Sequence, residues 1–260
     1  MNPCWLFALA AAGALLVIEG RAQESPHAAL VDELVTANRI LFDQNVVDGF
    51  GHVSVRDPDH PGQFYIARGM SPALVTRDDI GLFDLDGLLL SRLSGRPNSE
   101  RFIHAEIYRA RPDVNAVVHS HSPNVIPFGV SNVPLRPIFH DASFLEPSAP
   151  VFEIRATAGD STDMLVRTPE LGRALAKSLG SANVVLMRGH GDAVVAPNLK
   201  TVVYRAVYTD VNARLQMQAL ALGGPVTYLS SGEAERLERY GVEVGFDRVW
   251  ELWKSRVGPK

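Results

Sequence analysis

The chain has 260 residues, of which 46% are apolar and 21% are charged. This apolar share can form a sizeable hydrophobic core, so the composition excludes an intrinsically disordered protein. The 25 basic and 29 acidic residues give a formal net charge of -4, which argues against a nucleic-acid-binding protein that relies on a basic surface. A single cysteine, Cys4, excludes a disulfide scaffold.

The first 22 residues have the pattern of an export signal. Residues 5–18 (WLFALAAAGALLVI) are apolar, too short for a bilayer-spanning helix but suited to the hydrophobic region of a signal peptide. Gly20 and Ala22 are small residues at the −3 and −1 positions of a cleavage site after Ala22. Residues 1–4 contain no Lys or Arg, so a hydrophobic arm packed on the protein or on a partner subunit is the alternative. We expect a periplasmic or secreted protein if the signal is cleaved, a cytoplasmic one otherwise, and no permanent membrane span.

The next part of the chain alternates patterns typical of helices and strands. Ser25-Pro26 resembles a helix start, and apolar residues at helical spacing predict a helix up to about Phe42. The pattern that follows predicts strands over 52–56 and 64–67, a hairpin within 82–90, a helix over 99–110, and a buried strand over 116–118 that leads into His119.

The second half continues the alternation. Residues 123–150 hold six prolines and are expected to form turns. The remaining patterns predict strands over 151–155 and 183–187 and helices over 168–179, 198–222 and 230–240. The order of elements predicts one α/β domain with helices on both faces of a sheet. We divide the chain into a signal (1–22), this domain (23–224) and a C-terminal helical extension (225–260).

Two histidines at the end of a predicted strand suggest a metal site. His119 and His121 are two residues apart, so on a strand their side chains project from the same face. Neutral imidazole is a common ligand of Zn²⁺ and related ions. The alternative is a pair of surface or hydrogen-bonded histidines at a strand end.

His190 and Glu100 are the further candidates. His190 lies between two glycines directly after a predicted strand, where it is either a third metal ligand or a histidine in a glycine-rich turn. Glu100 lies in the first turn of a predicted helix, where it is either a functional carboxylate or a capping residue. His104 lies four residues further along the same helical face and can pair with Glu100.

Taken together, these segments are similar to the class II aldolase/adducin family. The similarity covers roughly residues 28–224. The segments that carry it are Gly51-His52-Val53-Ser54-Val55-Arg56, Asp84-Leu85-Asp86-Gly87, Ser99-Glu100, Arg111-Pro112-Asp113, Asn115-Ala116-Val117-Val118-His119-Ser120-His121 and Gly189-His190-Gly191.

The resemblance implies a fold, a cofactor and an activity. The fold is a three-layer α/β/α sandwich with a mixed, largely antiparallel central sheet, often in a homotetramer with active sites near subunit interfaces. His119, His121 and His190 become the ligands of one divalent metal ion, and Glu100 takes the position of the acid/base glutamate. Zn²⁺ suits three imidazoles best, although Mn²⁺ and Co²⁺ also fit. The implied activity is that of a metal-dependent carbon–carbon lyase.

Two departures from the family pattern concern the substrate. His52 stands where sugar-phosphate members usually have Asn, and the second loop, Ala67-Arg68-Gly69-Met70-Ser71-Pro72, lacks their Ser-Gly pair. Both features of those members help to hold phosphate. We therefore expect a small, non-phosphorylated hydroxy-carbonyl or hydroxy-carboxylate substrate, with decarboxylation favoured over aldol cleavage. The chain resembles the family branch that decarboxylates hydroxylated aromatic or heteroaromatic acids.

Four more residues are candidates for an anionic or polyhydroxylated substrate. Arg68, Ser71 and Arg188 are candidates for substrate binding, with surface ion pairs as the alternative for the two arginines. His140 is a candidate catalytic residue that protonates product or binds substrate, with a subunit interface as one place for this role; the alternative is a buried histidine paired with Asp141. The alternative function is a non-catalytic, adducin-like metal-binding or interaction module.

Overall fold

The computed structural model describes Met1, residues 27–244 and residues 246–258. The predicted export signal, its cleavage site and the helix start at Ser25-Pro26 lie outside these residues. Within the described part of the chain, no helix combines the length and the apolar character that a membrane span requires.

A mixed sheet forms the central layer of the described structure. All neighbouring strands pair antiparallel except β5 and β6, which are parallel. The order across the sheet is β3 (Ile80–Asp84), β2 (Gln63–Ala67), β1 (His52–Arg56), β4 (Ala116–Ser120), β7 (Gly191–Ala196), β6 (Val184–Met187) and β5 (Val151–Phe152). The predicted mixed, largely antiparallel sheet is confirmed.

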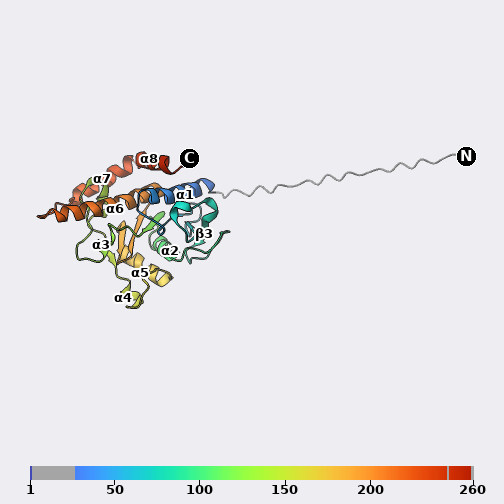
Figure 1. The fold of residues 1–260 in the computed structure, drawn as a ribbon, viewed down its shortest axis with the longest axis horizontal. Helices are drawn as coiled ribbons and strands as arrows, with labels where there is room; N and C mark the ends of the chain where they lie inside the picture. The colour runs from blue at the N-terminus through green and yellow to red at the C-terminus, as the bar shows by residue number, and fades with distance from the viewer. Residues whose placement is uncertain (2–26, 245, 259–260) are drawn as a thin grey trace.

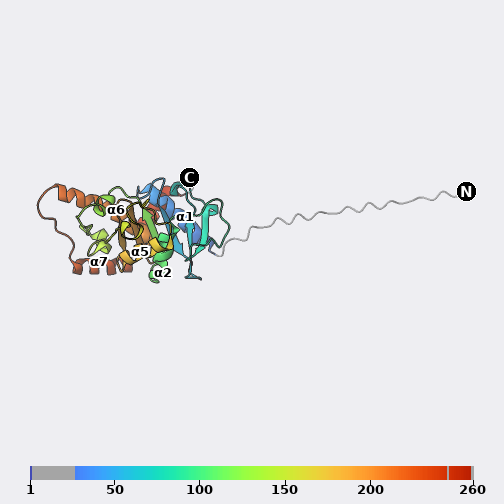
Figure 2. The same ribbon diagram turned by 90° about the horizontal axis from the view of Figure 1, so that it is seen from below.

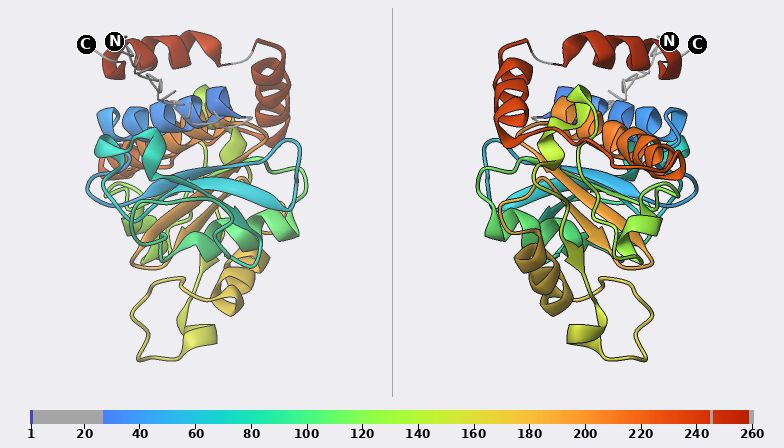
Figure 3. Two further views of the ribbon diagram at one scale, coloured as in Figure 1. Left: turned by 90° about the vertical axis from the view of Figure 1, so that its right-hand side faces the viewer. Right: turned by 90° about the vertical axis from the view of Figure 1, so that its left-hand side faces the viewer.

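Helices cover both faces of this sheet (Figures 1 and 3). One face packs against α1 (Ala28–Asp43) and α6 (Leu199–Ala221), and the other against α2 (Arg101–Ala110) and α5 (Pro169–Leu179). Successive side chains of β4 point to opposite faces of the sheet. Val118 packs in the core under α1 and α6, while Val117 packs in the core under α2 and α5. The predicted three-layer α/β/α arrangement is therefore confirmed.

The C-terminal helices extend the α1–α6 layer. A connection at one end of the molecule joins α6 to α7 (Ser231–Val244), which contacts the short helix η3 (His140–Leu145) (Figure 2). The following α8 (Asp247–Val257) packs on α1 and buries Trp250 and Trp253. The remaining short helices are η1 (Pro72–Leu74), η2 (Arg77–Asp79), α3 (Ile126–Gly129) and α4 (Arg155–Ala158).

The structure corrects several predicted elements. The strand predicted over 151–155 ends at Phe152, because the Glu153 carboxylate accepts a hydrogen bond from the backbone N–H of Arg155 and stabilises a turn into α4. The central strand β7 and the separate helix α8 were not predicted. In the predicted hairpin over 82–90, a single bridge joins Phe83 to Leu89.

Candidate metal centre

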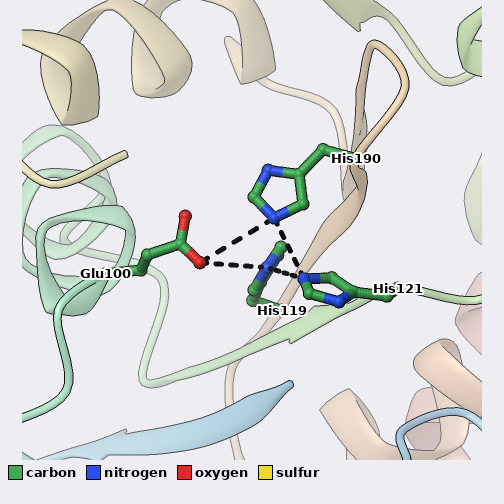
Figure 4. A group of neighbouring side chains, drawn as sticks. All are labelled: Glu100, His119, His121 and His190. Carbon is green, nitrogen blue, oxygen red and sulfur yellow. Dashed lines mark hydrogen bonds and ion pairs between the residues drawn. The ribbon is translucent and has the colours of Figure 1, made fainter. Parts of the chain in front are cut away.

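Three separate elements place the predicted site residues side by side. His119 is near the end of β4 and His121 lies just beyond it, while His190 lies in the tight turn between β6 and β7. Glu100 is the residue before the first turn of α2. All four side chains point toward one another from these elements (Figure 4).

Strand register explains why His190 reaches the pair. Ser120 pairs with Asp192, so β7 begins beside the end of β4. The strands approach so closely that a Cβ atom on Gly191 would lie 1.8 Å from the backbone oxygen of Ser120. Gly189 has a positive φ of 65°, a conformation that glycine adopts without steric cost. Glycine is therefore required at Gly191 by the close approach of two strands, and it is favoured at Gly189 by the positive φ.

The donor atoms of the four residues converge on one point. The Nε2 atom of His121 lies 3.1 Å from Nε2 of His119 and 2.9 Å from Nε2 of His190. The Oε2 atom of Glu100 lies 3.8 Å from Nε2 of both His119 and His190. Two nitrogens that are each ~2.0–2.1 Å from one Zn²⁺ ion lie at most about 4 Å apart. The spacing of the imidazole nitrogens therefore fits a shared small cation.

The protonation of His119 also suits a metal ligand. Its buried ring donates from Nδ1 to the backbone oxygen of Asp192 over 2.8 Å, which leaves the lone pair of Nε2 directed at the cluster. Burial lowers the pKa of His119 and His121, and it lowers the pKa of His190 to about 4. Metal binding requires neutral imidazole, and burial favours that form.

Glu100 has one anchored and one free carboxylate oxygen. Its Oε1 atom accepts a hydrogen bond of 2.9 Å from the backbone N–H of Val166, and Oε2 faces the histidines. Burial raises the pKa of Glu100, while the Val166 amide and the charge of Arg167 partly offset this effect. The carboxylate makes no capping bond to α2; instead, Asn98 accepts from the Glu100 backbone N–H. The capping alternative for Glu100 is therefore wrong.

His104 does not pair with Glu100. Its Nε2 atom lies 2.7 Å from Nδ1 of His52, and its Nδ1 atom lies 2.6 Å from the hydroxyl of Ser54. The side chain is fully buried between β1 and α2. The expected Glu100–His104 contact is replaced by a link from α2 to the first residue of β1.

The two candidate arginines both form ion pairs. Nε of Arg68 donates to Asp79 over 2.7 Å, and Nε of Arg188 donates to Glu153 over 2.9 Å. These contacts match the ion-pair alternative for each arginine. Arg188 nevertheless lies two residues before His190, so its substrate-binding role stays a prediction.

Ser71 is connected to the cluster through the loop before β1. Its hydroxyl lies 3.5 Å from the backbone oxygen of Asp48, and the negative charge of Asp48 acts on His121. Two residues later, the ring of Phe50 stacks on that of His121, with 6.0 Å between the ring centroids. Phe50 was not singled out from the sequence, because only the folded loop shows which side chain this aromatic ring contacts.

His140 lies apart from this cluster within the described chain. It is on η3, where its Nε2 atom is 3.6 Å from Asp141 and its side chain is 71% exposed. It lines a cavity of 520 Å³ together with residues of α7. A catalytic role for His140 stays a prediction, and it requires delivery of this side chain from a second subunit.

Comparisons with known proteins agree on one family. Residues 32–217 match the model of the class II aldolase and adducin N-terminal domain. The chain is 33% identical to the decarboxylase tropJ of Talaromyces stipitatus and 30% identical to a 3,4-dihydroxyphthalate decarboxylase of Arthrobacter keyseri. Each alignment covers 89% of this chain and 95% of the relative. An L-fuculose 1-phosphate aldolase structure is similar with a TM-score of 0.71 and 22% identity, covering 82% of this chain and 96% of that one.

Proposed function

Because the chain belongs to the class II aldolase and adducin family, we propose that it is a divalent-metal-dependent carbon–carbon lyase that decarboxylates a small, non-phosphorylated hydroxy-carboxylate. The observation that carries the proposal is the convergence of three imidazole nitrogens and one free carboxylate oxygen within 4.8 Å. His119, His121 and His190 would hold the ion, with Zn²⁺ favoured over Mn²⁺ and Co²⁺.

The chain's own residues account for the proton transfer. A bound divalent ion supplies Lewis-acid stabilisation of the negative charge that develops on oxygen beside the breaking bond. When CO₂ leaves, the bonding electron pair stays on the substrate carbon, and that carbon takes up one proton. Glu100 is the proton-transfer group, because Val166 holds Oε1 in place and leaves Oε2 free beside the histidines. Burial raises the pKa of Glu100 in the metal-free site, and the step needs a carboxyl group that takes up a proton and passes it on.

Two residues beside the cluster favour an aromatic acid over a sugar phosphate. Phe50 is 69% exposed, and its ring lies beside that of His121 with the two planes inclined by 27°, so it offers an exposed aromatic surface next to the proposed metal site. His52 occupies the position where sugar-phosphate members of the family have Asn. Both curated relatives named above are decarboxylases, and the name of one specifies a dihydroxylated aromatic acid.

The activity is tested with the full, metal-loaded protein and a panel of catechol-type and hydroxypyridine carboxylates. We expect metal-dependent release of CO₂ from at least one of them. The His119→Ala variant should lose both bound metal and activity, while His60→Ala, which changes an exposed histidine outside the cluster, should keep both. If only phosphorylated ketoses are turned over, the protein is an aldolase and not a decarboxylase. A protein that takes up no divalent ion contradicts the lyase proposal, and one that binds metal without any turnover fits the adducin-like module.

Assembly and location complete the proposal. We propose a homotetramer in which His140 of one subunit approaches the metal centre of another, since within one chain it lies apart from the cluster. We also propose export after cleavage behind Ala22, based on the apolar run over residues 5–18. Size-exclusion chromatography with light scattering measures the first, and N-terminal analysis of the mature protein measures the second.

A further inference from the structure

A chain of four buried polar side chains runs from the core to the edge of the metal centre. The hydroxyl of Tyr108 lies 2.7 Å from that of Ser54, which in turn lies 2.6 Å from Nδ1 of His104. Nε2 of His104 lies 2.7 Å from Nδ1 of His52. The four residues are at most 7% exposed, and they link α2 to β1 behind the metal cluster.

The direction of these hydrogen bonds follows from the inner end of the chain. Tyr108 has one proton to donate, and the guanidinium of Arg56, whose Cζ lies 4.7 Å from the ring centroid, offers only N–H donors. Among the described residues, the hydroxyl of Ser54 is the acceptor within hydrogen-bonding distance of this proton. Tyr108 therefore donates to Ser54, because a buried phenol proton without an acceptor is costly.

Each later bond in the chain is then determined. Because Ser54 accepts a hydrogen bond from Tyr108, its own hydroxyl proton points elsewhere, and the acceptor within reach is Nδ1 of His104. A neutral imidazole with an acceptor at Nδ1 has its proton at Nε2, so His104 donates to Nδ1 of His52. His52 must in turn have its proton at Nε2. Each of the two rings therefore has one unprotonated nitrogen that accepts a hydrogen bond, and is neutral with a single proton.

The free end of the chain lies beside the metal ligands. His52 pairs with His119 across β1 and β4, and their ring centroids are 5.0 Å apart. Within the described part of the chain, no hydrogen bond involves Nε2 of His52. The unprotonated nitrogens of the imidazole ligands and the Glu100 carboxylate can only accept hydrogen bonds. The N–H of His52 therefore adds a hydrogen-bond donor beside them.

We propose that Tyr108, Ser54 and His104 hold His52 in its Nε2–H tautomer, and that this N–H donates to a carboxylate oxygen of the substrate. His52 is then a substrate-binding residue, while the other three are positioning residues that act through it. The substrate class rests on the proposed function, but the tautomer does not, because it follows from the hydrogen bonds of the protein alone.

The first test reads the tautomer directly. We expect ¹⁵N solid-state NMR of histidine-labelled, zinc-loaded protein to show a protonated Nε2 and an unprotonated Nδ1 for His52, with the signals assigned by their loss in His52→Gln. The Tyr108→Phe variant should shift these signals toward a mixture of tautomers, because the proton that sets the direction is gone. A wild-type His52 protonated at Nδ1 would overturn the proposal.

The second test measures binding rather than turnover. Calorimetry with zinc-loaded protein compares 3,4-dihydroxybenzoate with catechol, which lacks the carboxylate. We expect His52→Leu to weaken dihydroxybenzoate binding roughly 10-fold or more and to leave catechol binding nearly unchanged, since a hydrogen bond to a charged group is lost. His52→Gln retains an N–H donor and should recover part of the affinity.

A matched pair of tyrosine variants separates positioning from general stability. Tyr108→Phe should weaken dihydroxybenzoate binding at unchanged zinc content. Tyr65→Phe, which removes another buried hydroxyl from the neighbouring strand β2, should have no such effect. Equal affinity in His52→Leu and wild type contradicts the proposal. If the tautomer and the carboxylate preference are found but no acid releases CO₂, the proposed function fails while this inference stands.

Discussion

Individual hydrogen bonds decide which atoms face the candidate metal centre. Nδ1 of His119 is occupied by the backbone oxygen of Asp192, and Oε1 of Glu100 is occupied by the backbone N–H of Val166. Nε2 of His119 is thus left to bind a metal ion, and Oε2 of Glu100 is left to transfer a proton. Because both partners are backbone groups, they hold these side chains whatever side chains Asp192 and Val166 have.

The Glu100→Gln variant tests the role of the free oxygen. Glutamine has the same shape and can still accept from Val166, but it does not exchange a proton. We expect kcat for CO₂ release to fall roughly 10²–10⁴-fold, with little change in zinc content. Glu170→Gln, an exposed glutamate of α5, serves as the control and should keep the wild-type kcat. An unchanged kcat in Glu100→Gln would remove Glu100 from the mechanism.

At the scale of single elements, helix ends illustrate what local sequence specifies. The side chain of Asn198 accepts from the backbone N–H of Thr201 over 2.8 Å and caps α6, and Thr168 caps α5 in the same way. Both helices begin where the sequence predicts, because a cap acts on residues two or three positions away. By contrast, β7 obtains its hydrogen bonds from β4 and β6, which come from different parts of the chain.

Removing the cap of α6 should lower the stability of the whole domain. We expect Asn198→Ala to reduce the free energy of unfolding by about 1 kcal/mol, because the N–H of Thr201 loses its acceptor. Asn198→Asp retains a capping oxygen and should stay close to wild type. Urea unfolding followed by circular dichroism measures both, and an equal loss in the two variants would contradict the capping explanation.

At the scale of the whole molecule, the metal centre concentrates buried imidazole. Burial lowers the pKa of five histidines: His52, His104, His119, His121 and His190. The unfolded chain takes up protons on these groups below about pH 6.5, whereas the folded chain does not. Asp192 has the opposite effect, because burial raises its pKa to about 7 and the folded state then keeps a proton that the unfolded state loses.

We therefore expect the metal-free protein to lose stability in acid. The contribution of the histidines is fully present above about pH 6.5 and is lost as the pH falls, so the free energy of unfolding should drop by at least about 2 kcal/mol between pH 7 and pH 5. The Asp192→Asn variant removes the opposing contribution and should show a steeper loss. Urea titrations at each pH provide the measurement; stability that rises toward pH 5 would contradict the assignment of neutral histidines.

The sequence by itself predicted most of the longer helices and strands and helices on both faces of a sheet, and its motifs pointed to four candidate site residues, His119, His121, His190 and Glu100. These features depend on spacing along the chain and on short motifs, which are local properties. Residues 151–155 show the limit, since hydrogen bonds from Arg155 to the Glu153 carboxylate stabilise a turn where the pattern predicts a strand.

Only the tertiary structure decided how the site is assembled. The placement of β7 between β4 and β6 brings His190 to the histidine pair, and the pairing of His52 with His119 places a second polar network beside it. The same contacts remove Glu100 from capping, separate His104 from it and set Phe50 against His121. Each depends on residues that are far apart in the chain, and their proximity results from strand register and close packing rather than from local spacing.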